Sequence, residues 1–360
     1  MKTFSRSATL GFAALACAFL LSLLAPTAGA AEAKPKFKLA WTIYVGWMPW
    51  DYAAQSGILQ KWADKYGVEI EVTQVNDYVE SINQYTAGAF DACVMTNMDA
   101  LTIPAAGGVD STALLVGDYS NGNDGVILRG KDHLADIKGQ HVNLVELSVS
   151  HYLLARALDS MGASEKDIKV VNTSDADIVA AATAPGTTAV VTWNPQLAEI
   201  RKQPGMHQVF DSSAIPGEIL DLLVVKTDLL RKHPELGKAL AGAWYEVLAL
   251  MAQKEAGKAA REAMAKASGT DLAGFDAQLA TTFMFWTAKD ATAFARSPAL
   301  PATMAKVASF SFAHGLLGEG AKSAEAVGMS FPGGNSDVRA ASVKLRFDDT
   351  WMALAADGKL

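Results

Sequence analysis

Short apolar runs alternate with longer segments of helical period along most of this chain, and this alternation limits the fold more than any other feature. Apolar strands that are buried on both faces need helices on each side of their sheet, which is the arrangement of α/β proteins. The first such runs lie at residues 37–44, 68–75, 92–95, 112–117 and 125–128. We therefore expect an α/β fold, with these strands completing a first unit.

The segments between the runs carry helix boundary signals. Pro49 is tolerated in a first helical turn and Gly67 is a typical stop, so one helix is expected through residues 51–66. Asp77 can cap a second helix, which Gly88 ends.

A second set of runs follows the charged turn at residues 129–138 and predicts a second unit of the same class. Its strands are expected at residues 141–145, 168–172 and 188–192, and residues 222–225 read as a strand that returns to the first unit. The chain then crosses between units near Leu128 and near Leu222. The expected division is a first lobe of residues 31–127 and 226–360, which includes the C-terminal helices, and a second lobe of residues 128–225.

The first thirty residues have the features of a secretory leader. Lys2 and Arg6 precede an apolar run at residues 8–25, and residues 28–30 read Ala-Gly-Ala, an A-x-A cleavage site. A membrane anchor is the alternative reading, but the run is short and Pro26 follows it at once. We expect cleavage after Ala30 and a periplasmic protein.

Cysteine content and charge exclude several classes of protein. Cys17 lies inside the apolar run, which argues against lipidation there, and Cys93 is the only other cysteine, so the cleaved chain has no internal disulfide and no cysteine-based metal site. Removing Lys2 and Arg6 from 31 basic residues leaves 29 against 38 acidic ones, a net charge of 29 − 38 = −9. Such a chain is not expected to bind nucleic acid.

Polar and aromatic residues follow strand after strand, where ligands bind in α/β sheets. Each has a structural alternative, because tryptophans fill cores, Thr96 and Asn97 can cap a helix, and the loop at residues 118–124 can be an ordinary turn. Their recurrence favours one shared cleft. The candidate ligand-binding residues are Trp47, Trp50, Thr96, Asn97, Asp118, Tyr119, Ser120, Asp124, Glu146, Ser148, Trp193, Asn194 and Glu218.

The distribution of basic residues indicates the charge of the ligand. Residues 66–128, 170–200 and 203–225 contain no lysine or arginine. A cleft built from these segments has few cations for a sulfonate, phosphate or nitrate, although backbone N–H groups at helix starts can bind anions. A neutral or cationic ligand is expected, stacked on Trp47, Trp50 or Trp193 with Glu146, Asp118 or Glu218 as the counter-charge. Such a cation–π contact contributes about 0.5–2 kcal/mol.

The sequence contains no constellation that indicates catalysis. It has no phosphate-binding loop, no G-x-G-x-x-G, no G-x-S-x-G and no H-E-x-x-H. His133, His141 and His151 lack metal-ligand spacing and are expected on surfaces or in packing. We expect no enzyme activity, no cofactor and no metal.

Three stretches resemble the nitrate/sulfonate/taurine class of ABC-importer binding proteins. They are Tyr-Val-Gly-Trp-Met-Pro-Trp-Asp-Tyr-Ala-Ala-Gln-Ser-Gly-Ile-Leu at residues 44–59, Gly-Ala-Phe-Asp-Ala at residues 88–92 and Thr-Trp-Asn-Pro at residues 192–195. Within the class the chain looks most like a subgroup associated with urea carboxylase and thought to serve urea or guanidine. The missing basic residues depart from the anion-binding members.

The resemblance implies a Venus flytrap of two α/β lobes joined by a two-strand hinge, and a monomer that delivers its solute to a permease and ATPase. Guanidinium only donates hydrogen bonds, whereas urea also needs donors such as Asn97, Asn194 or Ser148. The alternatives are a nitrate, sulfonate or taurine importer component, a periplasmic sensor, and an enzyme like the thiamine-pyrimidine synthases. The last uses a cluster of cysteines and histidines that this chain lacks.

Overall fold

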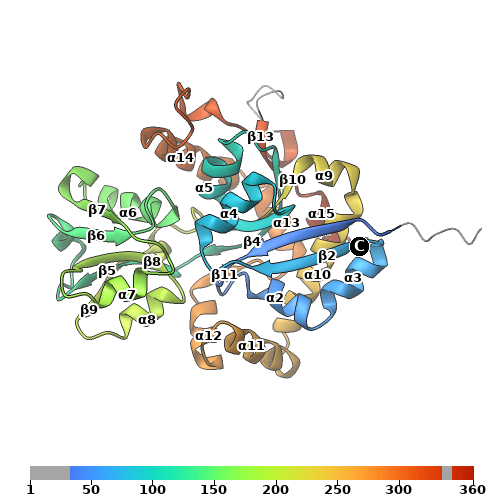
Figure 1. Ribbon diagram of the computed structural model, residues 1–360, viewed down its shortest axis with the longest axis horizontal. Coiled ribbons are helices and arrows are strands. Elements are labelled where there is room, and N and C mark those ends of the chain that lie inside the picture. The colour runs from blue at the N-terminus through green and yellow to red at the C-terminus, as the bar shows by residue number, and fades with distance from the viewer. Residues whose placement is uncertain (1–32, 335–342) are drawn as a thin grey trace, which may run out of the picture. The chain divides into compact units, whose positions relative to one another are not determined.

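The computed structural model describes residues 33–334 and 343–360. The leader expected at residues 1–30 lies outside the described residues and stays a prediction. Within the described part of the chain, no helix combines the length and the apolar character needed to cross a membrane. Residues 35–360 are built on two β-sheets (Figure 1).

The first sheet is mixed. β1 pairs in parallel with β2 and β3, whereas β10 runs antiparallel between β3 and β4. In spatial order its strands are β12 (Gly328–Ser330), β13 (Val343–Phe347), β4 (Ser111–Ser120), β10 (Leu220–Lys226), β3 (Ala92–Thr96), β1 (Lys36–Trp41) and β2 (Glu69–Gln74), with β11 (Thr282–Met284) paired to β4.

The second sheet has five strands, in the order β7 (Lys169–Asn172), β6 (His141–Leu144), β8 (Ala189–Trp193), β5 (Asp124–Arg129) and β9 (Met206–Asp211). β5 was expected in the first unit, but it pairs with β8 and β9. The chain therefore crosses between the sheets at residues 121–123 and 212–219, not near Leu128 and Leu222. A short apolar run carries no signal of which strand it pairs with, which explains the difference. We propose lobe boundaries that follow the sheets.

Helices cover both sheets. Those associated with the second sheet are α6 (Val149–Ser160), α7 (Ile178–Thr183) and α8 (Gln196–Arg201). The others are α2 (Met48–Gln55), α3 (Ile58–Tyr66), α4 (Tyr78–Ala87), α5 (Asn97–Ala100), α9 (Thr227–Lys232), α10 (Pro234–Met251), α11 (Glu255–Ala267), α12 (Leu272–Leu279), α13 (Ala288–Ala295), α14 (Ala299–Ala313) and α15 (Thr350–Ala356). Short helical turns lie at η2 (Leu101–Ala105), η3 (Leu134–Ile137), η4 (Glu165–Asp167), η5 (Ser212–Ala214), η6 (Ala324–Ala326) and η7 (Pro332–Gly334).

Successive residues of a strand point to opposite faces of its sheet, so the two faces of one sheet pack into two different hydrophobic cores. In the second sheet, Ile127 and Val190 belong to the cluster that includes Ile178 and Leu197 from α7 and α8. Their neighbour Val126 belongs to the larger core instead, which also contains residues of α6. Figure 1 shows α6 on one side of this sheet and α7 and α8 on the other. The near-continuous apolar runs of the sequence are the consequence of this double coverage.

The single helix expected at residues 51–66 is two helices. α2 ends before Ser56, and Gly57 adopts a left-handed conformation with φ of 80° before α3 begins. Glycine reaches this conformation without the steric penalty that other residues meet, so it permits the break. The expected helix over residues 77–88 is confirmed: Asp77 accepts from the Glu80 N–H and Gly88 ends α4.

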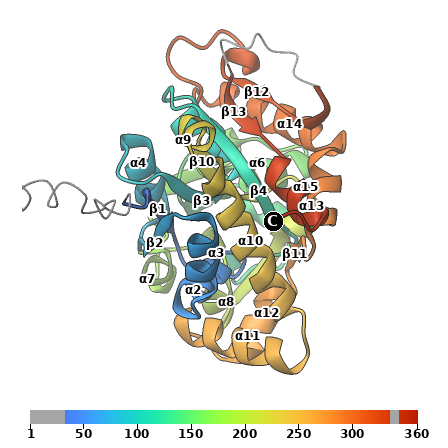
Figure 2. The same cartoon turned by 90° about the vertical axis from the view of Figure 1, so that its right-hand side faces the viewer.

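Helix α10 packs against α3 at a glycine, and this contact gives a prediction about stability (Figure 2). A Cβ atom at Gly242 would lie 2.3 Å from the Trp62 ring, whose Nε1 donates to Glu246 at 2.6 Å. Gly242→Ala should therefore lower the free energy of unfolding by about 1–3 kcal/mol through overpacking. Denaturant titration measures this change. Gly186→Ala is the control, because a Cβ there meets no atom within 4 Å; equal midpoints for both variants would contradict the prediction.

Candidate ligand-binding site

Four aromatic rings enclose a small cavity, and we call them the aromatic cage: Tyr44, Trp47, Tyr78 and Trp193. The Trp47 and Tyr78 rings are stacked with centroids 5.7 Å apart, and the Trp193 ring meets the Tyr78 ring edge-on at 5.6 Å. Tyr44 completes the wall with its ring 5.0 Å from that of Trp47. All four side chains are buried. The free volume of about 20 Å³ has room for about one water molecule.

The four rings of the aromatic cage come from three separate parts of the chain. Tyr44 and Trp47 lie in the turn between β1 and α2, and Tyr78 is the first residue of α4. Trp193 is the last residue of β8 and pairs in register with Asp124, the first residue of β5. The second sheet therefore places one aromatic and one acidic side chain side by side at the ends of two neighbouring strands, where they face Tyr44, Trp47 and Tyr78.

Four buried carboxyl groups lie beside the aromatic cage. We call them the acid cluster: Asp99, Asp118, Asp124 and Asp221. Asp221 on β10 lies opposite Thr96 on β3 and opposite Asp118 on β4. Like charges at directly opposed positions destabilise a sheet, so this arrangement is unfavourable for folding alone. Asp124 and Asp221 line the cavity.

Neutral donors satisfy part of the acid cluster. The Tyr44 hydroxyl donates to Asp118 at 3.1 Å, and the Tyr78 hydroxyl donates to Asp99 at 2.6 Å. Thr96 donates to the same Asp99 carboxyl at 2.7 Å. Asp99 Oδ1 and the Trp47 Nε1–H have no hydrogen-bond partner among the described residues. Within the described part of the chain, no ion pair joins any carboxyl of the cluster to a lysine, arginine or histidine.

Burial without a cationic partner makes these carboxyls hard to ionise. Desolvation by burial raises the pKa of Asp118 to about 7, that of Asp124 to about 7 and that of Asp99 to about 6. Burial, followed by repulsion from Asp118, raises the pKa of Asp221 well above its usual value. The site therefore binds protons at a pH where exposed carboxyls have lost theirs.

These shifts predict an unusual dependence of stability on pH. Unfolded aspartates titrate near 3.9, so between about pH 4 and pH 7 the folded chain holds more protons than the unfolded chain. Stability from this source is full at low pH and is lost as the pH rises through the folded pKa values. We expect the melting temperature of the ligand-free protein to fall between pH 5 and pH 8.

Thermal denaturation at constant ionic strength measures this effect. Glu165 acts in the opposite direction, because hydrogen bonds from His151 lower its pKa to about 2, but that contribution changes only below about pH 4.5. A melting temperature that stays level or rises from pH 5 to pH 8 would show that the acid cluster is ionised in the folded protein.

Some of the residues proposed from the sequence come together here. Trp47, Thr96, Asp124 and Trp193 line the cavity, and Asp118 lies beside it. Sequence reasoning missed Tyr44, Tyr78, Asp99 and Asp221. Asp221 did carry a signal, because it is the single charge in the apolar run Ile-Leu-Asp-Leu-Leu-Val-Val at residues 219–225.

Other proposed residues make structural contacts. Trp50 stacks on Trp244 at 5.1 Å, Tyr119 stacks on Phe283 at 4.5 Å, and Asn97 bonds to the backbone of Glu218 and Leu220. Ser120 bonds to Ser212, Ser148 caps α6, and Asn194 accepts from the Ala198 N–H. Glu146 is exposed, and its backbone N–H donates to Asn172. Their part in ligand binding stays a prediction.

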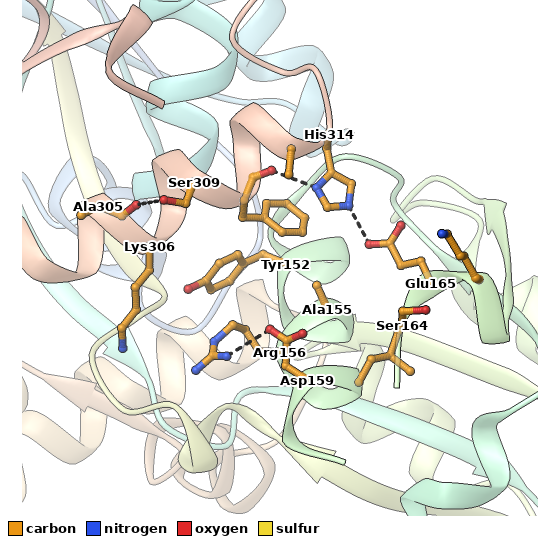
Figure 3. A pocket seen from close by; sticks show the side chains of 14 residues that line it. Tyr152, Ala155, Arg156, Asp159, Ser164, Glu165, Ala305, Lys306, Ser309 and His314 are labelled. Carbon is orange, nitrogen blue, oxygen red and sulfur yellow. Dashed lines mark hydrogen bonds and ion pairs between the residues drawn. The ribbon is translucent and has the colours of Figure 1, made fainter. Parts of the chain in front are cut away.

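A larger groove of about 840 Å³ lies between α6 and α14 (Figure 3), and three of its lining residues bond to Glu218. Tyr152 and Arg156 donate to its Oε2 at 2.7 and 2.9 Å, and Lys306 donates to Oε1 at 2.6 Å. Burial alone would raise the pKa of Glu218, but Arg156 and Lys306 hold it below the usual value. This carboxylate is already paired, so it is a poor counter-charge for a ligand.

His151, Glu165 and His314 meet at the same groove, with their ligand atoms within 4.8 Å of one another. His314 Nε2 lies 2.7 Å from the Glu165 carboxylate (Figure 3), and His151 Nε2 lies 3.3 Å from it. His151 Nδ1 accepts from the Leu147 N–H at 3.1 Å, so the ring carries its proton on Nε2. A metal would need that Nε2 lone pair. The cluster therefore suits hydrogen bonding better than metal binding.

Comparisons with known proteins agree with this architecture. The taurine-binding periplasmic protein of Escherichia coli (strain K12) is 27% identical over 132 residues, which span 36% of this chain and 40% of that protein. The match thus covers less than half of that relative.

Solved structures extend the likeness to most of the chain. The alkanesulfonate-binding protein SsuA from Xanthomonas axonopodis pv. citri bound to MOPS has a TM-score of 0.65 at 17% identity, over 80% of this chain and 96% of that chain. The periplasmic nitrate-binding protein NrtA from Synechocystis PCC 6803 has a TM-score of 0.56 at 15% identity, over 68% and 70%. The expected two-lobed α/β fold of periplasmic binding proteins is confirmed. A model of the NMT1-like family matches residues 31–267, well over half of the sequence, and the chain therefore belongs to the NMT1-like family.

Proposed function

We propose that this protein is the extracytoplasmic solute-binding component of an ABC importer and that its solute is guanidinium or urea, with guanidinium the better fit. One observation carries the choice of solute: a cage of four aromatic rings beside four buried carboxyls that have no ion-pair partner among the described residues. A planar cation that only donates hydrogen bonds would stack on the rings and give the carboxyls their missing charge.

The same chemistry disfavours an anion. The relatives named for taurine, alkanesulfonate and nitrate bind anionic or zwitterionic solutes, and a sulfonate needs convergent N–H donors or cations. Here an anionic group would face Asp124 and Asp221 instead. The segments without lysine or arginine in the sequence explain this difference, since all four acid-cluster residues come from them.

Capture requires the two lobes to move. A cavity of about 20 Å³ is too small for guanidinium, and its walls come from both sheets, so we infer that the lobes separate to admit the solute and close on it. In this proposal the leader directs the chain to the periplasm, and the closed form docks as a monomer on the permease that the ATPase drives. A periplasmic sensor would use the same site.

Isothermal titration of the secreted protein with guanidinium, urea, nitrate and taurine tests the proposal. We expect guanidinium to bind most tightly at millimolar or lower concentration, with urea weaker and both anions without measurable heat. Binding of nitrate or taurine in preference to guanidinium would overturn the choice of solute and indicate that backbone N–H groups form the site.

A further inference from the structure

Two members of the acid cluster form a pair that cannot be fully ionised without an added cation. Asp118 and Asp221 lie directly opposite each other on β4 and β10, and both are buried. Two ionised carboxylates at such positions repel each other where water cannot screen them, so one of them keeps a proton unless a cation is added. We call these two residues the carboxyl pair.

The groups around the carboxyl pair do not supply positive charge. Tyr44, from the turn after β1, donates a neutral hydroxyl, and Thr282 on β11 lies 3.5 Å from that hydroxyl. Asp124 on β5 faces the pair with a further carboxyl, and Asp99 on α5 acts on Asp124 in turn. The ligand-free site therefore balances its charge with protons.

We propose that binding of an organic monocation displaces one proton from the Asp118–Asp221 carboxyl pair into solvent, so that the site exchanges a proton for its ligand. This inference rests on the proposed function. Before binding, the pair holds one proton and carries one negative charge. After binding, both carboxyls are ionised, the cation supplies one positive charge, and the released proton is taken up by the buffer. The net charge in the site is unchanged.

The exchange makes the carboxyl pair a determinant of specificity. A neutral solute such as urea brings no charge with which to replace the proton, so it must bind to the protonated site. By linkage, release of one proton makes the affinity for guanidinium rise tenfold for each unit of pH between the two pKa values of the pair, whereas the affinity for urea stays level. The two solutes are therefore separated by their pH dependence as well as by their strength of binding.

Titration calorimetry with guanidinium chloride, in two buffers of different ionisation enthalpy at pH 8, counts the released protons, because at that pH Asp118 has lost its proton and Asp221 has kept one. We expect close to one proton for guanidinium, none for urea, and a guanidinium affinity that rises from pH 5 to pH 8. Guanidinium binding whose heat does not depend on the buffer, with affinity level from pH 5 to pH 8, would overturn the exchange and leave the proposed function standing. Absence of guanidinium binding at every pH would overturn both.

Two variants identify the source of the proton. In Asp118→Asn the amide donates to Asp221 in place of the shared proton, so guanidinium should still bind but with proton release reduced to near zero. In Asp124→Asn the carboxyl pair is intact, so release should continue even if affinity falls. Loss of release in Asp124→Asn alone would overturn the assignment to the carboxyl pair.

A measurement without ligand checks the starting state. Carbon-13 spectra of protein labelled at aspartate carboxyls, compared with those of Asp118→Asn and Asp221→Asn, report the protonation of the carboxyl pair. We expect one proton on the pair at pH 8, above the pKa of Asp118. Two ionised carboxylates at that pH would overturn the proposal whatever solute the protein binds.

Discussion

Replacing Asp221 with asparagine is expected to stabilise the ligand-free protein and, at the same time, to weaken its binding of guanidinium. The carboxyl of Asp221 is buried at the cavity wall, opposite Asp118. At neutral pH the buried Asp221 carboxyl must hold a proton that the unfolded chain has lost, which destabilises the folded state, whereas the amide of Asn is neutral in both states. We expect a gain of about 1–3 kcal/mol in the free energy of unfolding at pH 7, since one unit of pKa shift corresponds to about 1.4 kcal/mol.

The affinity should change in the opposite direction. Truncating one partner of a buried charge pair costs about 2–5 kcal/mol of binding free energy, a loss of roughly 30-fold to several thousandfold. Denaturant titration without solute and calorimetry with guanidinium measure the two effects on the same samples. Asp221 thus destabilises the folded protein and strengthens binding. Residues that natural selection keeps for function often have this combination of effects.

Asp132→Asn is the matched control, because it makes the same chemical change at an exposed position, where the ion pair with His207 contributes little. Stability and affinity should both stay within about 0.5 kcal/mol of the parent. A loss of stability in Asp221→Asn would mean that a cation or hydrogen-bond donor already stabilises the Asp221 carboxylate in the ligand-free protein. If it gains stability but keeps its affinity, the cation is held elsewhere.

The fold was largely predictable because strand and helix periods are local properties of the sequence. Most strands of both sheets, the cap at Asp77 and the stop at Gly88 follow from the order of residues alone, whereas β9, β11, β12 and β13 were not expected. The sheet to which β5 belongs does not, because pairing depends on neighbours that are distant in sequence. For the same reason, the crossings between the sheets lie several residues before the positions expected near Leu128 and Leu222.

The candidate site was predictable only in part, for a related reason. The absence of lysine and arginine from three segments gave the charge of the site, and polar residues after strands gave Trp47, Asp124 and Trp193. Asp221 was missed because its importance arises from register: β10 runs antiparallel through the sheet and places it opposite Asp118. Tyr78 lies in the helix expected between Asp77 and Gly88, and a helical period does not show that its hydroxyl reaches Asp99.

Trp193→Ala should weaken binding chiefly by speeding dissociation. Trp193 is the ring that the second sheet contributes to the aromatic cage, and it meets Tyr78 from the other side of the cavity. In the proposed mechanism its contact with the solute forms only when the lobes close. Loss of its stacking and burial should cost about 1–3 kcal/mol, or roughly 5- to 150-fold in affinity. Most of this change should appear in the dissociation rate, as is usual for variants of one interface.

Stopped-flow fluorescence of the remaining tryptophans resolves the two rates, and two further variants separate a cage effect from general loosening. Trp193→Phe keeps an aromatic face and should recover much of the affinity. Trp50→Phe changes a tryptophan that stacks on Trp244 and does not line the cavity, so it should affect stability more than dissociation. Similar dissociation rates for Trp193→Ala and the parent would remove Trp193 from the site. Equal acceleration in Trp50→Phe would indicate that the whole lobe has loosened, because only a side chain that contacts the solute should affect its release selectively.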